Sequence, residues 1–423
     1  MHSPIFKCTK SWRRVNYVLT KWRFNSYAMD VSDSCANVQK EVWKSMRLLM
    51  IAPEQIAVPP PKGGSVEICM LAIAERLSLQ HQVTLMSRKY AHYPPVTING
   101  NLKIVRVPAS SPKHYIRAVM AYIRGKNFDW IQIDNRPRFV TPVRKIFPHT
   151  PISVFLHSLI FVSKPMIIES IAEMHLSKAD AIIANSNSLQ QELCTRFPRL
   201  RPKIKQVYLG VDLERFHPPS SGRRVKLRKE YDLQGAFVFA FVGRIIPRKG
   251  LPVLMKALRQ VRKTVPNAKL VIAGRGESGY MTQLKSKAHR LRLSAQFIGY
   301  KSHRKMHDVY AMADCLVCPS QRHEAFGLVN IEAMATGIPV IASKIGGISE
   351  AVQHGVNGLL IKDYRNASSF ASAMLKLAKD RAYSQSLGIQ ARRDMEQQFS
   401  WANTAQSLSD LYWSPSDERG GDV

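Results

Sequence analysis

Residues 315–342 read CLVCPSQRHEAFGLVNIEAMATGIPVIA and carry a strand, a helix and a second strand in succession. Residues 315–318 and 339–342 are short apolar runs of the kind found in strands that are buried on both faces of a sheet. Between them, Gly327 and Leu328 begin a segment with apolar residues at helical spacing. Two parallel strands need a crossover of this kind, so the stretch predicts a βαβ unit.

The same alternation runs outward in both directions from Met46 onward. A turn-rich connector at residues 216–222 separates two series, which predicts an α/β protein of two facing Rossmann-like domains, over 46–217 and 218–395. Open parallel sheets bind ligands at the carboxyl ends of their strands, so we expect the site in the cleft between the domains. The expected strands are 48–52, 83–87, 102–107, 130–133, 152–156 and 181–184, then 238–243, 269–274, 295–298, 315–318, 339–342 and 358–361, with helices such as 65–79 and 114–124 between them.

Composition narrows the class of protein. The 423 residues are 45% hydrophobic and 22% charged, which is ordinary for a globular protein and argues against wholesale disorder. No apolar run reaches the roughly 20 residues of a membrane span. Cations interrupt the first 25 residues, so no secretory signal is expected. The predicted location is the cytoplasm, including the inner membrane face or a spore coat as sites of peripheral association.

A net charge of +32 is spread along the whole chain. Such a surplus attracts nucleic acid, anionic membrane or acidic polymer in general. No nucleic-acid-binding motif and no basic stripe with interleaved aromatic residues is present, so we do not expect nucleic acid as a partner. In the helix 114–124, Ile116, Val119, Met120 and Ile123 share one face beside cationic residues. Two interpretations remain open, a peripheral membrane element and an ordinary βα helix with a solvated basic edge.

Two further features are interpreted as structural. The six cysteines are too few and too scattered for a disulfide framework, and Cys315 and Cys318 lie in a predicted strand without partners for a zinc site. We therefore expect buried thiols. Residues 1–45 lack glycine and a clear period, and they are interpreted as an extension outside the fold, with an aromatic and basic anchor as the alternative.

Three loops carry residue types suited to a phosphorylated ligand. Gly63 and Gly64 follow the first predicted strand and permit close backbone approach to a ligand at a helix N-terminus. In the second series, Gly243 ends a strand, and Arg244 and Lys249 follow before the next helix. Two cations beside a helix N-terminus suit a diphosphate, although a solvated basic loop is the plain alternative.

The third loop contains two glutamates eight residues apart. Glu324 precedes the helix that Gly327 and Leu328 begin, and Glu332 lies inside that helix. Because Gly327 and Leu328 begin this helix, its free N–H groups could also face a phosphate. A two-carboxylate glycosidase is the competing use of such a pair, but a helix and a loop do not place the two groups on either side of a sugar bond.

Together these motifs resemble the family 4 retaining glycosyltransferases of the GT-B fold, over about residues 46–413. The glutamate pair with its Phe-Gly-Leu and Glu-Ala-Met-Ala surroundings is the specific part, and the segment 52–67 is similar in particular to spore coat protein SA-type members. The resemblance also implies that the stretch 396–413 forms a last helix that crosses back to the first domain, followed by a tail at 414–423. The extension has no counterpart in the family pattern.

The resemblance implies a role for each site residue. Arg244 and Lys249 would neutralise the donor diphosphate, Glu324 would contact the donor sugar, and Glu332 would hold the ribose hydroxyls. His157, at the end of the strand 152–156, matches a family histidine near the donor sugar, whereas without that match a strand-end histidine would be taken as structural. The remaining donor-binding residues implied are Gly63, Gly64, Gly243, Tyr300, Phe326, Gly327 and Leu328.

The implied reaction is transfer of a sugar with retention of configuration, from a nucleotide-diphosphate sugar to a glycan, lipid or surface-polymer acceptor. We expect a UDP-sugar as co-substrate, no cofactor, and no metal, because no Asp-x-Asp occurs in the chain. Spore coat or cell-envelope polysaccharide synthesis is the implied setting. The alternative from another class is a nucleotide-sugar-binding spore-surface structural protein without turnover.

Overall fold

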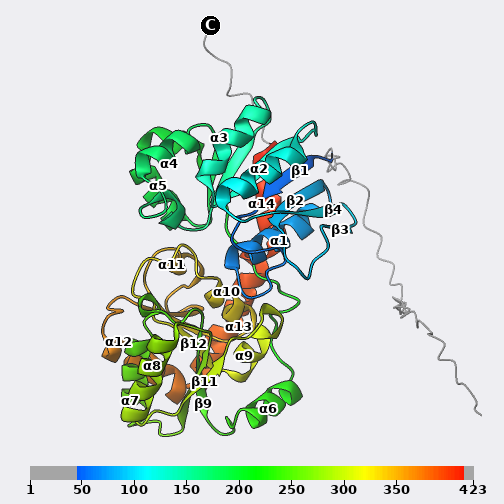
Figure 1. Ribbon diagram of the computed structural model, residues 1–423. Coiled ribbons are helices and arrows are strands. Elements are labelled where there is room, and N and C mark those ends of the chain that lie inside the picture. The colour runs from blue at the N-terminus through cyan, green and yellow to red at the C-terminus, as the bar shows by residue number, and fades with distance from the viewer. Residues whose placement is uncertain (1–44, 414–423) are drawn as a thin grey trace, which may run out of the picture. The chain divides into compact units, whose positions relative to one another are not determined.

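The computed structural model describes residues 45–413 (Figure 1). The extension and the tail predicted from the sequence lie outside the described residues, apart from Ser45. Two sheets organise the described chain, one of eight strands and one of six. The α/β architecture with two Rossmann-like sheets, predicted from the alternation of apolar runs and helical periods, is confirmed.

The first sheet has the order β3-β4-β2-β1-β5-β6-β7-β8. All its neighbouring strands are parallel except β3 and β4. Its strands are β1 (Arg47–Ile51), β2 (Gln82–Arg88), β3 (Val96–Asn99), β4 (Leu102–Val107), β5 (Trp130–Asp134), β6 (Ile152–Leu156), β7 (Ala181–Ala184) and β8 (Ile204–Gln206). The sequence prediction missed β3 and β8, because a short edge strand with exposed side chains lacks the apolar run that marks a buried one.

Helices cover both faces of this sheet. Side chains of α1 (Ser65–Leu77) pack on one face, and those of α2 (Pro112–Ile123), α3 (Pro137–Ile146), α4 (Glu169–Leu176) and α5 (Asn187–Arg196) pack on the other. In α2, Ile116, Val119 and Ile123 are buried in this core. The apolar face of α2 is therefore not available to a lipid surface, which favours the ordinary βα helix with a basic edge. Among the described helices, none combines the length and apolarity needed to cross a bilayer.

The second sheet has the order β11-β10-β9-β12-β13-β14, and all its pairs are parallel. Its strands are β9 (Phe237–Val242), β10 (Ala268–Ala273), β11 (Ala295–Gly299), β12 (Cys315–Cys318), β13 (Val340–Ser343) and β14 (Gly358–Ile361). Side chains of α7 (Leu251–Val261), α8 (Ser278–Arg290) and α12 (Ala367–Lys379) pack on one face, and those of α9 (Met306–Met312), α10 (Leu328–Ala335) and α13 (Arg381–Gln398) on the other. Every strand thus ends at the same edge as its neighbours.

The two cysteines of β12 are buried in this sheet. Burial raises the pKa of both the Cys315 and the Cys318 thiol, so neither is a ready thiolate at neutral pH. The prediction of buried structural thiols is confirmed.

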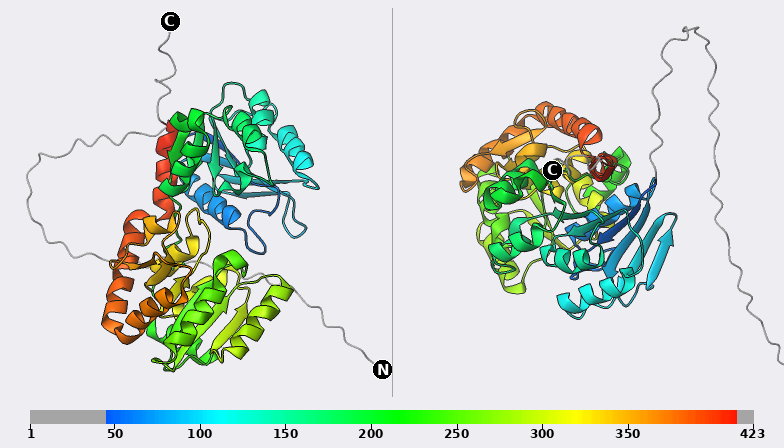
Figure 2. Two further views of the ribbon diagram at one scale, coloured as in Figure 1. Left: turned by 90° about the vertical axis from the view of Figure 1, so that its left-hand side faces the viewer. Right: turned by 90° about the horizontal axis from the view of Figure 1, so that it is seen from above.

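The last helix, α14 (Trp401–Trp413), packs against α1 of the first sheet. The ring of Tyr412 stacks on Trp130 of β5 at 4.8 Å between centroids, and its hydroxyl donates to Gln132. Gly210 allows the crossing, because a Cβ there would lie 2.3 Å from the backbone nitrogen of Trp401. Figure 2 shows this red helix leaving the orange part of the chain and running along the part that contains the first sheet. The last helix therefore ties the two sheets together.

Candidate functional site

The loop after β9 is held against the loop after β12. Gly250 has φ of 72°, and a Cβ at this position would lie 1.8 Å from the carbonyl oxygen of Pro319, so only glycine fits. The backbone N–H of Gln321 donates to the carbonyl of Arg248 at 2.8 Å. These contacts bring two loops that are some 70 residues apart in sequence into one surface at the carboxyl edge of the second sheet.

Lys249 and Glu324 form the centre of this surface. The Lys249 Nζ lies 2.5 Å from Glu324 Oε1, and the hydroxyl of Ser320 donates to the same oxygen at 2.9 Å. Both charged side chains are mostly buried, whereas Arg244 in the same loop is exposed. The second cation is thus free to meet a ligand, and the first one positions the carboxylate while adding its charge to the site.

The backbone around Glu324 is fixed by two glycines that follow β13. A Cβ on Gly346 would lie 2.1 Å from the carbonyl oxygen of Glu324, and the N–H of Gly347 donates to that oxygen at 3.0 Å. Gly327, with φ of 90°, is the N-cap of α10, and Leu328 is its first residue. The predicted placement of Glu324 before a helix N-terminus is therefore observed.

Glu332 lies within α10 and already has two partners. The Tyr310 hydroxyl donates to Oε2 at 2.6 Å, and His303 Nε2 is 3.3 Å from Oε1. Neither partner was identified from the sequence, because both come from the segment before and within α9, where no motif marks them. They orient the carboxylate that the family resemblance associates with ribose binding.

Phe326 directly precedes Gly327, and its side chain is buried. That side chain is 3% exposed and packs against the rings of Tyr208 and Phe399, which also contact one another. The side chain of Phe326 thus contributes to packing around these rings. The resemblance implies that Phe326 binds the donor, and this assignment stays a prediction.

The first glycine loop faces the second sheet. A Cβ on Gly63 would lie 3.9 Å from the ring of Tyr300, which follows β11 and is 40% exposed. Gly64 has φ of 131°, and a Cβ there would lie 2.7 Å from Glu67 Oε2. Gly243, with φ of 142°, has open space around its Cβ position, so only its backbone conformation requires glycine. The predicted loops of the two domains therefore approach one another.

His157 is held by two residues at the end of β5. Its Nε2 lies 2.9 Å from Asp134 Oδ1, and its backbone N–H donates to Asn135 Oδ1 at 2.8 Å. Gln132 donates to the other oxygen of the fully buried Asp134 carboxylate. An ionised carboxylate only accepts, so Nε2 carries the hydrogen and Nδ1 is the ring nitrogen left for a ligand. The adjacency of β5 and β6 in the sheet could have revealed Asp134, because parallel neighbours end at one edge.

A second contact between the two domains joins α11 (Ile348–Ala351) to the start of α5. Glu350, in α11, accepts hydrogen bonds from the backbone N–H groups of Asn187 and Ser188, at 2.7 and 2.8 Å, where α5 begins. His323 Nε2 lies 3.2 Å from the Ser188 hydroxyl. A carboxylate at a helix N-terminus is favourable. The contact places the segment before Glu324 next to the first domain.

Three further ionisable groups lie beneath the first glycine loop. Glu54 and Arg136 form a buried pair with Nε to Oε2 at 2.6 Å. Glu67 is 4% exposed, and burial raises its pKa from 4.5 to about 7, opposed in part by the charge of Arg136. The sequence showed Glu54 and Glu67 only as part of the family-like segment 52–67 and did not single out Arg136, since the pairing depends on the tertiary fold.

The titration of Glu67 predicts a pH-dependent stability. Because its folded pKa is raised, the folded protein binds more protons than the unfolded chain between about pH 4.5 and 7, and stability falls as pH rises through that window. At pH 8 the buried, ionised Glu67 lowers the free energy of unfolding by on the order of 3 kcal/mol. Glu67→Gln should therefore raise Tm relative to the parent at pH 8, by more than at pH 5. Glu214→Gln, at an exposed carboxylate, should show no such trend, and a difference for Glu67→Gln that is equal at both pH values contradicts the assignment.

Two protein-family models and a known relative match this chain. Residues 63–215 match the model of glycosyltransferase family 4, and residues 224–394 match that of glycosyl transferases group 1. Spore coat protein SA of Bacillus subtilis is 30% identical over 377 residues, which is 87% of this chain and 99% of that protein. The chain belongs to the family 4 glycosyltransferases. The resemblance predicted from the glutamate pair and the glycine loops is confirmed.

Two other relatives agree with this assignment. The putative glycosyltransferase YtcC of Bacillus subtilis is 31% identical over 379 residues, covering 87% of this glycosyltransferase and 92% of its own chain. The structure of Anabaena Alr3699/HepE in complex with UDP-glucose superposes with a TM-score of 0.70 at 23% identity, over 88% of this chain and all of that one. The latter supports the GT-B fold, with its two parallel-sheet domains.

Proposed function

We propose that this glycosyltransferase moves a sugar from a UDP-sugar to a glycan, lipid or surface-polymer acceptor, with retention of configuration and without a metal ion. The observation that carries the proposal is the Lys249–Glu324 pair beside the exposed Arg244, at the carboxyl edge of the second sheet. The UDP-glucose held by the structurally similar Anabaena protein supports the choice of donor.

Each part of the site has a role in this reaction. Arg244 and Lys249 stabilise the negative charge that develops on the departing nucleotide, which is electrostatic stabilisation of the transition state. Glu324 holds the donor sugar, and Glu332 holds the ribose. The bond from the anomeric carbon to the diphosphate breaks, the acceptor oxygen attacks from the same face, and a donor phosphate oxygen takes the acceptor proton. His157 is held by Asp134 with Nδ1 free to accept a hydrogen bond from the donor sugar.

The setting we propose is the cytoplasm, in spore coat or cell-envelope polysaccharide synthesis. The similarity to spore coat protein SA over nearly the whole of that protein supports the setting. The proposed setting includes peripheral association at the inner membrane face. The apolar face of α2 is buried, so that association would use another surface.

Release of nucleotide from a panel of UDP-, GDP- and ADP-sugars tests the proposal. We expect turnover with a UDP-sugar and a loss of about 100-fold or more in Glu324→Gln, with Glu214→Gln unchanged. With an acceptor in hand, the coupling constant of the product's anomeric proton gives the stereochemistry, and inversion would reject the retaining mechanism. Tight donor binding without release from any sugar would instead identify a binding protein without turnover.

A further inference from the structure

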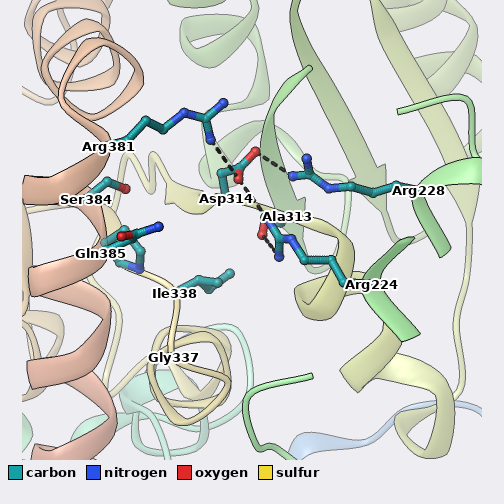
Figure 3. Close-up of a pocket in the computed structure, with 10 residues that line it drawn as sticks. Arg224, Arg228, Ala313, Asp314, Gly337, Ile338, Arg381, Ser384 and Gln385 are labelled. Carbon is teal, nitrogen blue, oxygen red and sulfur yellow. Dashed lines mark hydrogen bonds and ion pairs between the residues drawn. The ribbon is translucent and has the colours of Figure 1, made fainter. Parts of the chain in front are cut away.

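A cavity with a volume of about 390 Å³ lies at the amino edge of the second sheet (Figure 3). Asp314 in its wall directly precedes β12, whereas Glu324 follows that strand. The four residues of β12 correspond to roughly 13 Å of extended chain, so the cavity is distinct from the proposed donor site. Its volume is typical of small-ligand pockets.

Three arginines in this wall converge on one carboxylate. The Nη2 atoms of Arg224 and Arg228 lie 2.8 and 2.6 Å from the Asp314 oxygens, and Nη1 of Arg381 lies 3.1 Å away. Arg224 and Arg228 come from α6 (Ser221–Glu230), and Arg381 is the first residue of α13. Figure 3 shows Asp314 with Arg381 on one side and with Arg224 and Arg228 on the other. Within the described part of the chain, Asp314 is the one acidic residue lining the cavity against three arginines, which leaves an excess of two positive charges.

An excess of this kind is unfavourable without a counter-anion. Burial lowers the pKa of Arg224, and the neighbouring Arg228 and Arg381 lower it further against the effect of Asp314. Guanidinium groups stay charged in proteins, so the repulsion is not relieved by loss of a proton. A bound anion would relieve it, because each additional negative charge among the three cations is attractive.

A purely structural ion pair accounts for only part of the arrangement. Arg228 also donates to the carbonyls of Met312 and Ala236, and Arg224 donates to those of Ala311 and Ala313. Both arginines therefore tie α6 to the rest of the second domain. Arg381 differs, since its side chain is 53% exposed and Asp314 is its single hydrogen-bond partner among residues 45–413. Its guanidinium also lies over the ring of Phe237, with Cζ 4.5 Å from the ring centroid, and neither Nε nor Nη2 takes part in a hydrogen bond within residues 45–413. Ser384 and Gln385, one turn further along α13, add a hydroxyl and an amide to the same wall.

We propose that this cavity binds a phosphate-bearing small molecule through Arg381, Arg224 and Arg228. A phosphate group carries nearly two negative charges near neutral pH, which matches the excess, and the guanidinium fork fits its oxygens. The helix α10, which carries Glu332, ends next to Gly337 and Ile338 of the cavity wall. A ligand here contacts the end of an element whose other end lies at the donor loops. The inference stands whether or not the proposed reaction is correct.

Titration calorimetry of the full chain with inorganic pyrophosphate, in chloride buffer at fixed ionic strength, tests the proposal. Pyrophosphate also suits the loop of Arg244 and Lys249, so the parent should show two sites. Lys249→Gln should keep the cavity site, Arg381→Gln should keep the donor site, and the double variant should bind at neither. We expect at least about tenfold weaker binding at the cavity in Arg381→Gln.

Two more variants separate binding from folding. Gln385→Glu changes an exposed residue and places a negative charge in the wall, so it should weaken the cavity site while all three arginines remain. Arg290→Gln, at an exposed position at the end of α8, should change nothing. Glucose 6-phosphate and inorganic phosphate serve as further probes of the cavity site. If the ligand is a phosphorylated metabolite, glucose 6-phosphate should bind more tightly than inorganic phosphate. A single pyrophosphate site that is lost in Lys249→Gln, or no response to Arg381→Gln and Gln385→Glu, overturns the proposal.

Discussion

Replacement of Lys249 by methionine is expected to lower kcat for nucleotide release by about 100- to 1,000-fold. The ammonium group lies 2.5 Å from Glu324, in the loop that we propose faces the donor diphosphate. The variant would therefore remove a cation from the departing nucleotide and leave a mostly buried carboxylate without its cation. Methionine keeps the length of the side chain. Steady-state release of nucleotide with the preferred donor measures the effect.

The double variant Lys249→Met/Glu324→Gln adds a sharper test. If the two residues act as a unit, the loss in the double variant should be much smaller than the product of the single losses. Lys256→Met, an exposed lysine of α7, is the matched control and should leave turnover unchanged. A loss below about tenfold in Lys249→Met would show that this cation does not stabilise the transition state.

Replacement of Arg136 by methionine is expected to lower the free energy of unfolding by about 3–5 kcal/mol. Arg136 donates from Nε and Nη2 to both oxygens of Glu54, at 2.6 and 3.1 Å, and both residues are under 10% exposed. Removal of one partner leaves a buried charge without compensation, which costs far more than the net contribution of the pair. Urea unfolding followed by fluorescence or circular dichroism measures the change.

Two comparisons identify the cause of that loss. The double variant Arg136→Met/Glu54→Met should recover much of the stability, because it removes both charges and fills the space with apolar side chains. Arg47→Met breaks an equally bidentate pair with Asp129 at the surface, where side chains are 49% and 39% exposed, and should cost much less. An equal loss in Arg47→Met, or no recovery in the double variant, would argue against uncompensated burial as the cause.

The buried strands were predictable because they are covered on both faces. In β9 and β12 every residue is buried, and such runs of apolar side chains stand out in a sequence regardless of their neighbours. The edge strand β3 has mostly exposed side chains and gave no such signal. The glycine loops were visible for a related reason, since positive φ at Gly64 and Gly327 demands one residue type.

The partners of the site residues were not predictable in the same way. The sequence places His157 at a strand end, but that Asp134 holds its Nε2 depends on β5 and β6 being neighbours in the sheet. Likewise, Tyr310 and His303 reach Glu332 only because α9 packs beside α10. These contacts join residues more than 20 positions apart, and local pattern carries no information about such distances.

The sequence gives the net charge of +32, but it does not show which of the charged residues lie close together. The sequence alone determined the family, the two-sheet architecture and the glycine loops at the strand ends, because backbone conformation and strand burial leave local marks in the choice of residues. Only the tertiary structure decided which cations act together. Arg224, Arg228 and Arg381 are separated by up to 157 positions, yet they share Asp314. Electrostatic interactions depend on distance in space and on burial, and chain folding sets both.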